Sequence, residues 1–289
     1  IRDEILKKLD SIDVDAILSL DDIASYFQGK NLFPVYQYIG SPDLACRRLY
    51  NGEFLIIIDC VSTVMAIPVT LSISSRMSID NLNIPLFTFI ERFFVLFALF
   101  ISTIFLGLLV SFTTYQTDSL SLRTLSILKI TQNGVVFPIF LEVLIVLALF
   151  ELFYLIGFRQ SKLTISSTVV LIGGIIIGDN LVKSGIAGVF IITITAICFL
   201  MSFVVSSNVT ILMSISVIRL ITLISSFYFG LLGVLFSSII LFYFLYKQVS
   251  MSVHYFYPFV PFDLKGIYNF FISTSSPKNI KRDKEMKIH

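Results

Sequence analysis

Apolar residues run through this chain in stretches about as long as a bilayer is thick. From Phe93 to Tyr246 only ten residues are formally charged, six Lys or Arg and four Asp or Glu. A buried helix of a soluble protein keeps a polar edge, whereas a membrane-spanning helix needs about 20 mostly apolar residues. The pattern therefore predicts a polytopic α-helical membrane protein.

We expect about six spans, with five or four as the alternatives. An even number places both ends of the chain on one side of the membrane. The third span is interrupted by glycines, and the last two nearly abut, so a tight re-entrant pair is an alternative there. The predicted spans are Phe93–Phe112, Val135–Ile156, Leu163–Leu181, Ile186–Val205, Val209–Tyr228 and Phe229–Tyr246.

The residues before the first span show the pattern of a small α/β domain. Ser41-Pro42-Asp43 is typical of a helix start, and Asn51-Gly52 is typical of a helix end. The β-branched runs Glu53–Asp59 and Thr63–Val69 predict a β-hairpin. Three parts follow: 1–92, the C-terminal part of a soluble α/β cytosolic domain; 93–246, a transmembrane domain; and 247–289, an interfacial segment with a basic tail. Because the chain begins with Ile1 rather than Met, we expect a longer protein upstream.

Charge is unevenly distributed between the two ends. Residues 1–92 hold 8 Lys or Arg against 12 Asp or Glu, whereas residues 247–289 hold 7 against 3. A basic tail beside a membrane domain indicates the cytoplasmic side, and the loop with Arg159 and Lys162 would share that side. Arg123 and Lys129, on the opposite side, weaken the assignment. Lipid headgroups are the expected partner of the tail, rather than nucleic acid.

Residues that commonly form metal sites and disulfides are scarce. Cys46, Cys60 and Cys198 lack the spacing of a zinc site or a disulfide framework, and only His254 and His289 offer imidazole. Phosphate-binding, dinucleotide-binding and nucleophile motifs are absent from the sequence. We therefore expect no enzyme, no cofactor and no metal.

Two acidic residues lie on the second predicted span. Glu142 and Glu151 are nine residues apart, so at about 100° per residue they face opposite sides of one helix and cannot form a carboxylate pair there. One could face a water-filled path while the other meets a neighbouring helix or subunit. The alternative is structural, with Glu151 reaching toward the helix end and Glu142 paired inside the protein.

A polar stripe follows one face of the fifth predicted span. Ser216, Arg219, Thr222 and Ser226 recur at helical spacing on an otherwise apolar helix. The stripe is our candidate for a pore lining, with Glu142 as a possible counter-charge. The alternative is an interhelical hydrogen-bond seam.

Two further spacings concern pairing and packing. Asp179 and Lys183 are spaced for an ion pair on one helix face, and Gly174 and Gly178 are spaced for close helix approach. A lone subunit offers few partners for Glu142, Glu151 and Arg219, so we expect a homo-oligomer.

The order of several segments resembles the A subunits of spore germinant receptors, the GerA family. The segments span nearly the whole chain, and their order is more specific than any one of them. They are Ser41-Pro42-Asp43; Leu49-Tyr50-Asn51-Gly52-Glu53; Ile56-Ile57-Ile58-Asp59 and Pro68; Gly134-Val135-Val136-Phe137-Pro138 with Glu142 and Glu151; Ile177-Gly178-Asp179-Asn180 with Gly185-Ile186; Arg219 with Gly230 and Gly233; and Pro258-Phe259-Val260-Pro261 with Asp263-Leu264-Lys265.

Several positions depart from that family's pattern and indicate a divergent member. Cys60 stands where Gly usually follows the Asp, and Val136 stands for the first Pro of its element. Leu155-Ile156 stands for a Glu-Ala pair, and Asp179 and Lys183 stand for Gln and Glu.

The resemblance implies an N-terminally truncated membrane subunit of a nutrient germinant receptor in the inner spore membrane, with its soluble domain and tail in the cytoplasm. It implies a transporter-like B subunit and a lipoprotein C subunit as partners. It also implies a homo-oligomeric channel for monovalent cations. A non-conducting scaffold or accessory member of the family remains an alternative. A secondary transporter is disfavoured because the sequence has no repeated halves.

Overall fold

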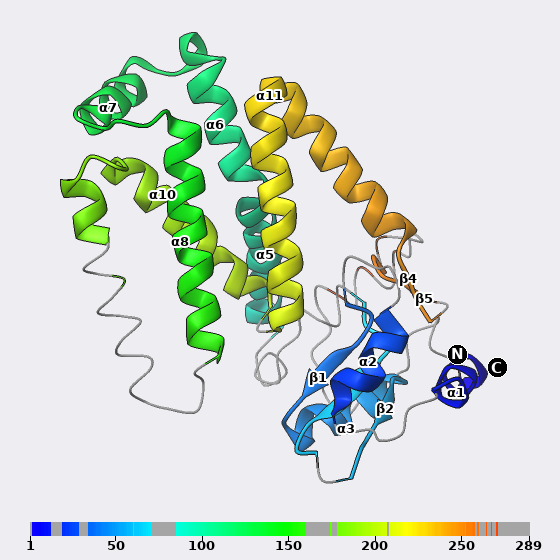
Figure 1. Cartoon of the computed structure of the whole chain (residues 1–289). Coiled ribbons are helices and arrows are strands. Elements are labelled where there is room, and N and C mark those ends of the chain that lie inside the picture. Colours follow the sequence, from blue (N-terminus) through cyan, green and yellow to red (C-terminus); the bar gives the residue numbers. More distant parts are fainter. Residues whose placement is uncertain are drawn as a thin grey trace. The chain divides into compact units, whose positions relative to one another are not determined.

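The computed structural model describes most of the chain, and structural statements below refer to those residues. They are 2–12, 19–28, 34–59, 61–70, 85–159, 174, 178–206, 208–251, 253–257, 259, 264, 267 and 270. Figure 1 shows a mostly helical chain with a small sheet region. The chain divides into two compact units. Unit 1 contains residues 1–97, 205–214 and 240–289, and unit 2 contains residues 98–204 and 215–239. The sequence-based boundaries at 92/93 and 246/247 stay a prediction.

Unit 1 contains a three-stranded antiparallel sheet in the order β1-β3-β2. Strands β2 (Phe54–Ile56) and β3 (Val64–Ile67) pair with Leu55 opposite Ala66. The predicted hairpin is therefore confirmed, with strands shorter than the β-branched runs. Strand β1 (Gln37–Ile39) pairs with the other edge of β3, and it was not predicted. It has three residues, too few for a clear alternating pattern.

Helix α3 (Pro42–Asn51) connects β1 to β2 and confirms the predicted helix. Ser41 is the N-cap residue, although its side chain makes no capping hydrogen bond. Gly52 ends the helix in the left-handed conformation at φ 97°, which glycine adopts without steric cost. The buried Arg48 guanidinium holds α3 to the sheet region by donating to Gln37 Oε1 at 2.7 Å and to Glu53 Oε1 at 3.3 Å.

Two further helices, α1 (Arg2–Asp10) and α2 (Leu20–Gln28), contribute to the core of unit 1. This core includes Phe27 and Met65, both nearly inaccessible to solvent. The Tyr38 hydroxyl donates a hydrogen bond to the carboxylate of Asp21. Burial, together with this hydrogen bond, raises the pKa of Tyr38, so the hydroxyl keeps its proton and remains a donor.

A short hairpin after the last helix joins the same core. Strands β4 (Val249–Ser250) and β5 (Val253–His254) pair in antiparallel fashion, and Met251 between them packs into the core that contains Met65. The buried Ser250 hydroxyl donates to Val35 O at 3.1 Å and accepts from Val69 N at 3.3 Å. Residues far apart in sequence are thereby tied together within unit 1.

The segment that corresponds to the first predicted span is a continuous helical stretch with a local change of winding. It consists of α5 (Pro85–Phe100), the π-helical turn η2 (Ile101–Phe105) and α6 (Leu106–Thr114). Within it, Leu86–Thr114 is long and apolar enough to cross a membrane. A long apolar helix therefore covers the predicted span at Phe93–Phe112 and starts earlier than predicted, and the crossing itself stays a prediction.

A helix also covers most of the second predicted span. After the short turn η3 (Thr117–Ser119) and helix α7 (Leu122–Gln132), helix α8 runs from Ile139 to Arg159. Residues Ile139–Gly157 of α8 are long and apolar enough to cross a membrane. Helix α7 was not predicted, because its mixture of polar and apolar residues has no clear helical period.

The third predicted span, Leu163–Leu181, lies mostly outside the described residues. Its end is described from Gly178 onward, where a helical stretch includes Asp179 and Lys183. Helix α10 (Val189–Val205) occupies the fourth predicted span with 17 residues, and it is a shorter apolar helix than the three candidate spans.

Helix α11 (Val209–Lys247) covers the last two predicted spans, and its backbone is not helical at Gly230 (φ 57°, ψ −138°). Figure 1 shows α11 turning back sharply near its middle, where its colour changes from yellow to orange. A side chain at Gly233 would lie 2.0 Å from the backbone oxygen of Ser225. Tyr115 supports the turn because its hydroxyl donates to Phe227 O at 2.6 Å. Two helical arms joined by a tight glycine turn therefore replace one straight helix.

We expect Gly233→Ala to destabilise the protein by about 3 kcal/mol, because the new methyl group would overlap backbone that cannot move without opening the turn. Gly157→Ala on α8 is the matched control, since open space surrounds its missing side chain. It should leave stability unchanged or raise it by up to about 1 kcal/mol. Thermal unfolding of the full chain in detergent measures both variants. Equal melting temperatures would show that the tight turn is not formed.

Candidate functional site

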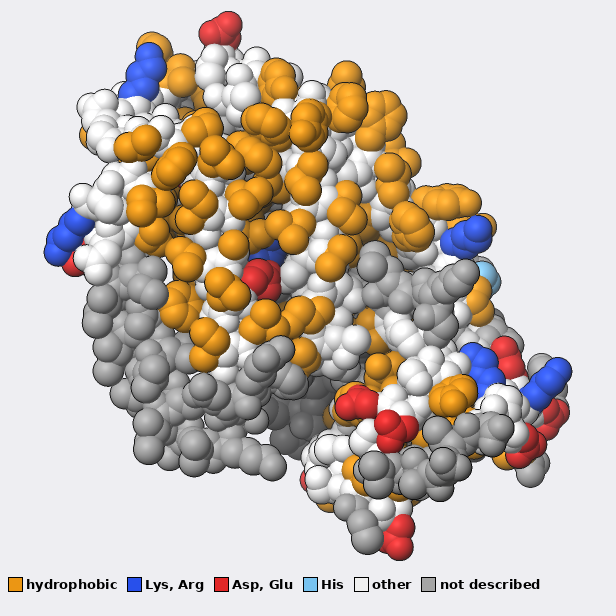
Figure 2. Space-filling view, viewed as in Figure 1, with side chains coloured by type: hydrophobic (Ala, Val, Ile, Leu, Met, Phe, Trp, Pro, Cys, Tyr) orange, Lys and Arg blue, Asp and Glu red, His pale blue; other side chains and the backbone are white. Residues whose placement is uncertain are grey.

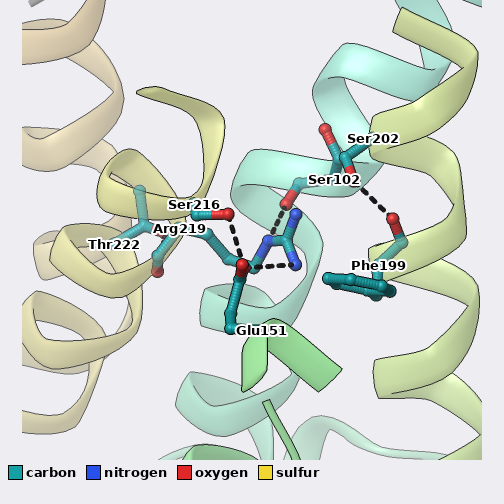
Figure 3. Close-up of polar contacts among 7 residues, drawn as sticks. All are labelled: Ser102, Glu151, Phe199, Ser202, Ser216, Arg219 and Thr222. Carbon is teal, nitrogen blue, oxygen red and sulfur yellow. Dashed lines mark hydrogen bonds and ion pairs between the residues drawn. The ribbon is translucent and has the colours of Figure 1, made fainter. Parts of the chain in front are cut away.

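A cluster of polar groups lies between helices of unit 2, and we call it the Arg219 seam. Its members come from η2, α8, α10 and α11. They are Ser102, Thr103, Glu151, Phe199, Ser216, Arg219 and Thr222. Figure 3 shows the Arg219 guanidinium directed toward Ser102 and Glu151, with the Phe199 ring beside it.

Arg219 is the central residue of the seam and is fully buried. Its Nε donates to the backbone oxygen of Ser102 at 2.9 Å, and its Nη1 lies 3.8 Å from Glu151 Oε1. Its Cζ atom lies 5.6 Å from the centre of the Phe199 ring, within the range of a cation–π contact. Among the described residues neither Nη1 nor Nη2 has a hydrogen-bond partner. The positive charge is therefore offset only partly.

Glu151 supplies the negative charge of the seam from the middle of α8. Its Oε1 accepts a hydrogen bond from the Ser216 hydroxyl, one turn before Arg219 on α11. Its side chain is 19% exposed, whereas that of Arg219 is wholly covered. Glu151 is therefore the charged member of the seam that reaches the surface of the single chain.

Thr222 joins the seam one turn after Arg219. Its hydroxyl donates to Thr103 O at 2.7 Å and is also 2.9 Å from its own helix's Arg219 O. A side chain at Gly107 would lie 3.2 Å from Thr222 O, so glycine at this position lets α6 approach α11 closely. Ser226 is buried as well, and among the described residues its hydroxyl bonds to Leu223 O in its own helix.

Apolar packing surrounds the seam on its α6 side. Seven buried side chains fill the space between α6, α8, α10 and α11: Leu106, Val110, Val143, Leu147, Ile191, Cys198 and Leu223. Because these groups exclude water, charges and hydrogen bonds in the seam act at low local dielectric, where both attraction and desolvation are large.

Glu142 occupies a separate position at the start of α8. It is fully buried, and its Oε2 accepts from Gly188 N at 3.0 Å, whereas Oε1 has no partner among the described residues. A side chain at Gly188 would lie 2.8 Å from Thr131 O, so glycine is needed for the chain to come this close. The expectation that Glu142 is the counter-charge of Arg219 is wrong, because Glu151 takes that place.

The two acidic residues of α8 thus have different neighbours. Glu151 meets α11, and Glu142 meets the backbone that precedes α10. The opposite-face geometry deduced from their spacing is consistent with these contacts. The expectation that a lone subunit offers few partners for the charged groups needs correction, because Arg219, Glu151 and Glu142 each have a contact within one chain.

The predicted polar stripe faces other helices of the same chain. Arg219, Thr222 and Ser226 are buried and Ser216 is partly buried, which is the arrangement of the interhelical seam named as the alternative. The role of the stripe in a conducting path stays a prediction. Ser102 and Thr103 were missed because they contribute through backbone oxygens. The only sequence signal was a Ser-Thr pair within an apolar span.

The remaining candidates lie elsewhere. Lys183 Nζ and Asp179 Oδ2 are 2.5 Å apart, so the predicted pair forms, with both side chains largely exposed. Exposed pairs contribute little to stability. A side chain at Gly174 or Gly178 would meet no atom within 4 Å, so their role in helix packing stays a prediction. In the described part of the chain no group of three or more His, Cys, Asp or Glu could hold a metal ion.

We expect Glu151→Leu to destabilise the protein by about 3–5 kcal/mol, because Arg219 would remain buried without a counter-charge. Adding Arg219→Leu should recover part of that loss, since the buried charge is then removed. Asp179→Asn is the control, because it breaks an exposed ion pair and should cost less than about 1 kcal/mol. Denaturation midpoints in detergent test the set. Strictly additive losses would mean that the two residues do not interact.

Comparison with known proteins places these features in a family. The family model described as Bacillus/Clostridium GerA spore germination protein matches residues 1–285. Spore germination protein XA of Bacillus anthracis is 27% identical over 256 residues, covering 88% of this chain and 52% of that protein. Spore germination protein KA of Bacillus subtilis (strain 168) is 27% identical over 268 residues, covering 91% of this chain and 48% of that protein.

A third relative has a different kind of name. Stage V sporulation protein AF of Bacillus subtilis (strain 168) is 24% identical over 276 residues, covering 94% of this chain and 55% of that protein. No solved structure matches the chain. The chain spans about half the length of these curated relatives. Because the family model matches nearly every residue, the chain belongs to the Bacillus/Clostridium GerA spore germination protein family.

Proposed function

We propose that this chain is the membrane subunit of a nutrient germinant receptor and that it triggers spore germination by forming a homo-oligomeric channel for monovalent cations. Its expected location is the inner spore membrane, with the soluble domain and basic tail in the cytoplasm. The observation that carries the proposal is the family match over residues 1–285, combined with three helices long and apolar enough to span a membrane. No catalysis and no cofactor are part of the proposal.

The surface of unit 2 supports a membrane location. Figure 2 shows hydrophobic side chains over most of the visible face of the helical region, with few charged side chains among them. Large apolar residues are exposed along every candidate span, for example Phe100 on α5, Leu152 on α8 and Ile221 on α11. Contact between such apolar faces and lipid tails has no hydrophobic cost, whereas contact with water does.

Glu151 supports assembly with further copies of the chain. Its partly exposed carboxylate lies near the middle of an apolar helix, where contact with lipid costs several kcal/mol. A neighbouring subunit that covers this carboxylate would remove that cost. A transporter-like B subunit and a lipoprotein C subunit remain the expected partners in the receptor.

Six spans remain our proposal for the topology. The glycine turn at Gly230 supports counting the two arms of α11 separately, because the close approach of Gly233 to Ser225 requires the chain to reverse direction. Each arm is long enough for a short span.

A non-conducting scaffold of the same family is the second candidate. The observation in its favour is the burial of Arg219, Thr222 and Ser226 inside a single chain, because a pore lining would be open to water. A secondary transporter is a weaker third candidate.

The channel proposal predicts that purified full chain forms a homo-oligomer in mild detergent and lets K⁺ or Na⁺ cross liposome membranes. Flux is measured with an ion-sensitive dye at fixed protein content, with and without the B and C partners. Protein-free liposomes are the control. A stable oligomer without flux in either condition would favour the scaffold, and substrate-dependent saturable exchange would favour the transporter. A monodisperse monomer, stable without partners, would contradict the channel.

An even number of spans predicts that a reporter fused after Lys287 lies on the same side of the membrane as residues 1–92, because six spans return the chain to its starting side. Alkaline phosphatase and fluorescent-protein fusions at both ends report the side in cells. A fusion in the 116–121 connection after α6 is the control and should report the opposite side. Opposite sides for the two ends would reject the even number of spans.

A further inference from the structure

The π-helical turn η2 and the buried Arg219 satisfy each other's hydrogen-bonding groups: η2 supplies a backbone acceptor, and Arg219 supplies a donor. A π turn holds one residue more than an α turn, so the widened turn leaves backbone oxygen without its usual partner. At η2 the oxygen of Ser102 accepts from Arg219 Nε, and the oxygen of Thr103 accepts from the Thr222 hydroxyl. Both donors come from successive turns of α11. The irregular turn and its two side-chain donors therefore form one device.

Each half of this device is unfavourable without the other. Arg219 is always charged and fully buried, and its Nη groups lack hydrogen-bond partners among the described residues. A leucine would remove that cost but would also remove the donor that Ser102 O has from α11. A regular α-helix would satisfy Ser102 O internally but would leave Arg219 Nε without an acceptor.

We propose that η2 is a register switch in the first span, and that Arg219 and Thr222 hold it in the π-helical state. When Arg219 withdraws from Ser102, the widened turn closes into an α-helical one. The residues that precede η2 then turn by about 100° and move by about 1.5 Å along the helix axis relative to α6. The switch lies within the fold of one chain, so it does not require that the protein forms a channel.

Glu151 is the residue through which a neighbouring chain could act on the switch. It binds both Ser216 and Arg219, and it is the exposed charged member of the seam. A cationic group from a neighbouring chain that bound Glu151 would compete with Arg219 for the carboxylate. The guanidinium would then lose its counter-charge, and its hold on Ser102 O would weaken.

A one-residue deletion tests the coupling. Removing Ser102 takes away the extra residue of the π turn while both flanking helices keep their faces. We expect Arg219→Leu alone to lower the melting temperature of the full chain in detergent. Arg219→Leu combined with the Ser102 deletion should fold and regain most of the loss, because the helix then has no extra residue that Arg219 must hold in a π turn. Deleting Leu109 from the regular helix α6 is the control and should not rescue Arg219→Leu. A double variant no more stable than Arg219→Leu overturns the proposal.

A distance measurement separates a switch from a simple structural tie. Spin labels at Phe94 and Thr114, both exposed, report the rotation across η2 in a background without the three native cysteines. The mean distance should shift in the folded fraction of Arg219→Leu and return near the wild-type value when Ser102 is also deleted. If Arg219→Leu folds with the wild-type distance, the register does not depend on Arg219 and the switch is rejected.

Discussion

The burial of one positive charge among apolar helices is the constraint on which unit 2 depends. Arg219 cannot be neutralised, so its surroundings must supply acceptors and a counter-charge. Three elements do so: η2 offers the oxygen of Ser102, α8 offers Glu151, and α10 offers the ring of Phe199. Each of these elements is thereby fixed against α11. In a membrane, where apolar side chains gain little by leaving lipid for protein, such polar contacts give helix packing its specificity.

Glycines provide the second constraint, because polar contacts between helices require short distances. Gly107 lets α6 approach Thr222, Gly188 lets the chain before α10 approach Thr131 and Glu142, and Gly233 lets the second arm of α11 fold back on Ser225. In each case a methyl group would overlap or crowd a backbone oxygen. The absence of a side chain at Gly107 therefore allows the close contact with Thr222 in the Arg219 seam, and its absence at Gly188 allows the contact with Glu142.

Local signals predicted the elements that they specify directly. Asn51-Gly52 ends α3 because only glycine adopts the left-handed conformation there at no cost, and the β-branched runs pair as β2 and β3. Long apolar runs predicted the spans that became α5–α6 and α8. Strand β1 and helix α7 have no such local signal. The π turn has none either, because its extra residue is stabilised by side chains more than a hundred positions away.

By itself the sequence determined the family, indicated the membrane class and predicted the opposite faces of Glu142 and Glu151, because hydropathy and helical period are local properties. Only the tertiary structure decided the partners. The sequence analysis named Glu142 as the possible counter-charge of Arg219, whereas the packing of α8 against α11 places Glu151 beside it. Whether a polar stripe faces water or another helix likewise depends on which helices pack against it. The sequence of the helix that carries the stripe does not determine that packing.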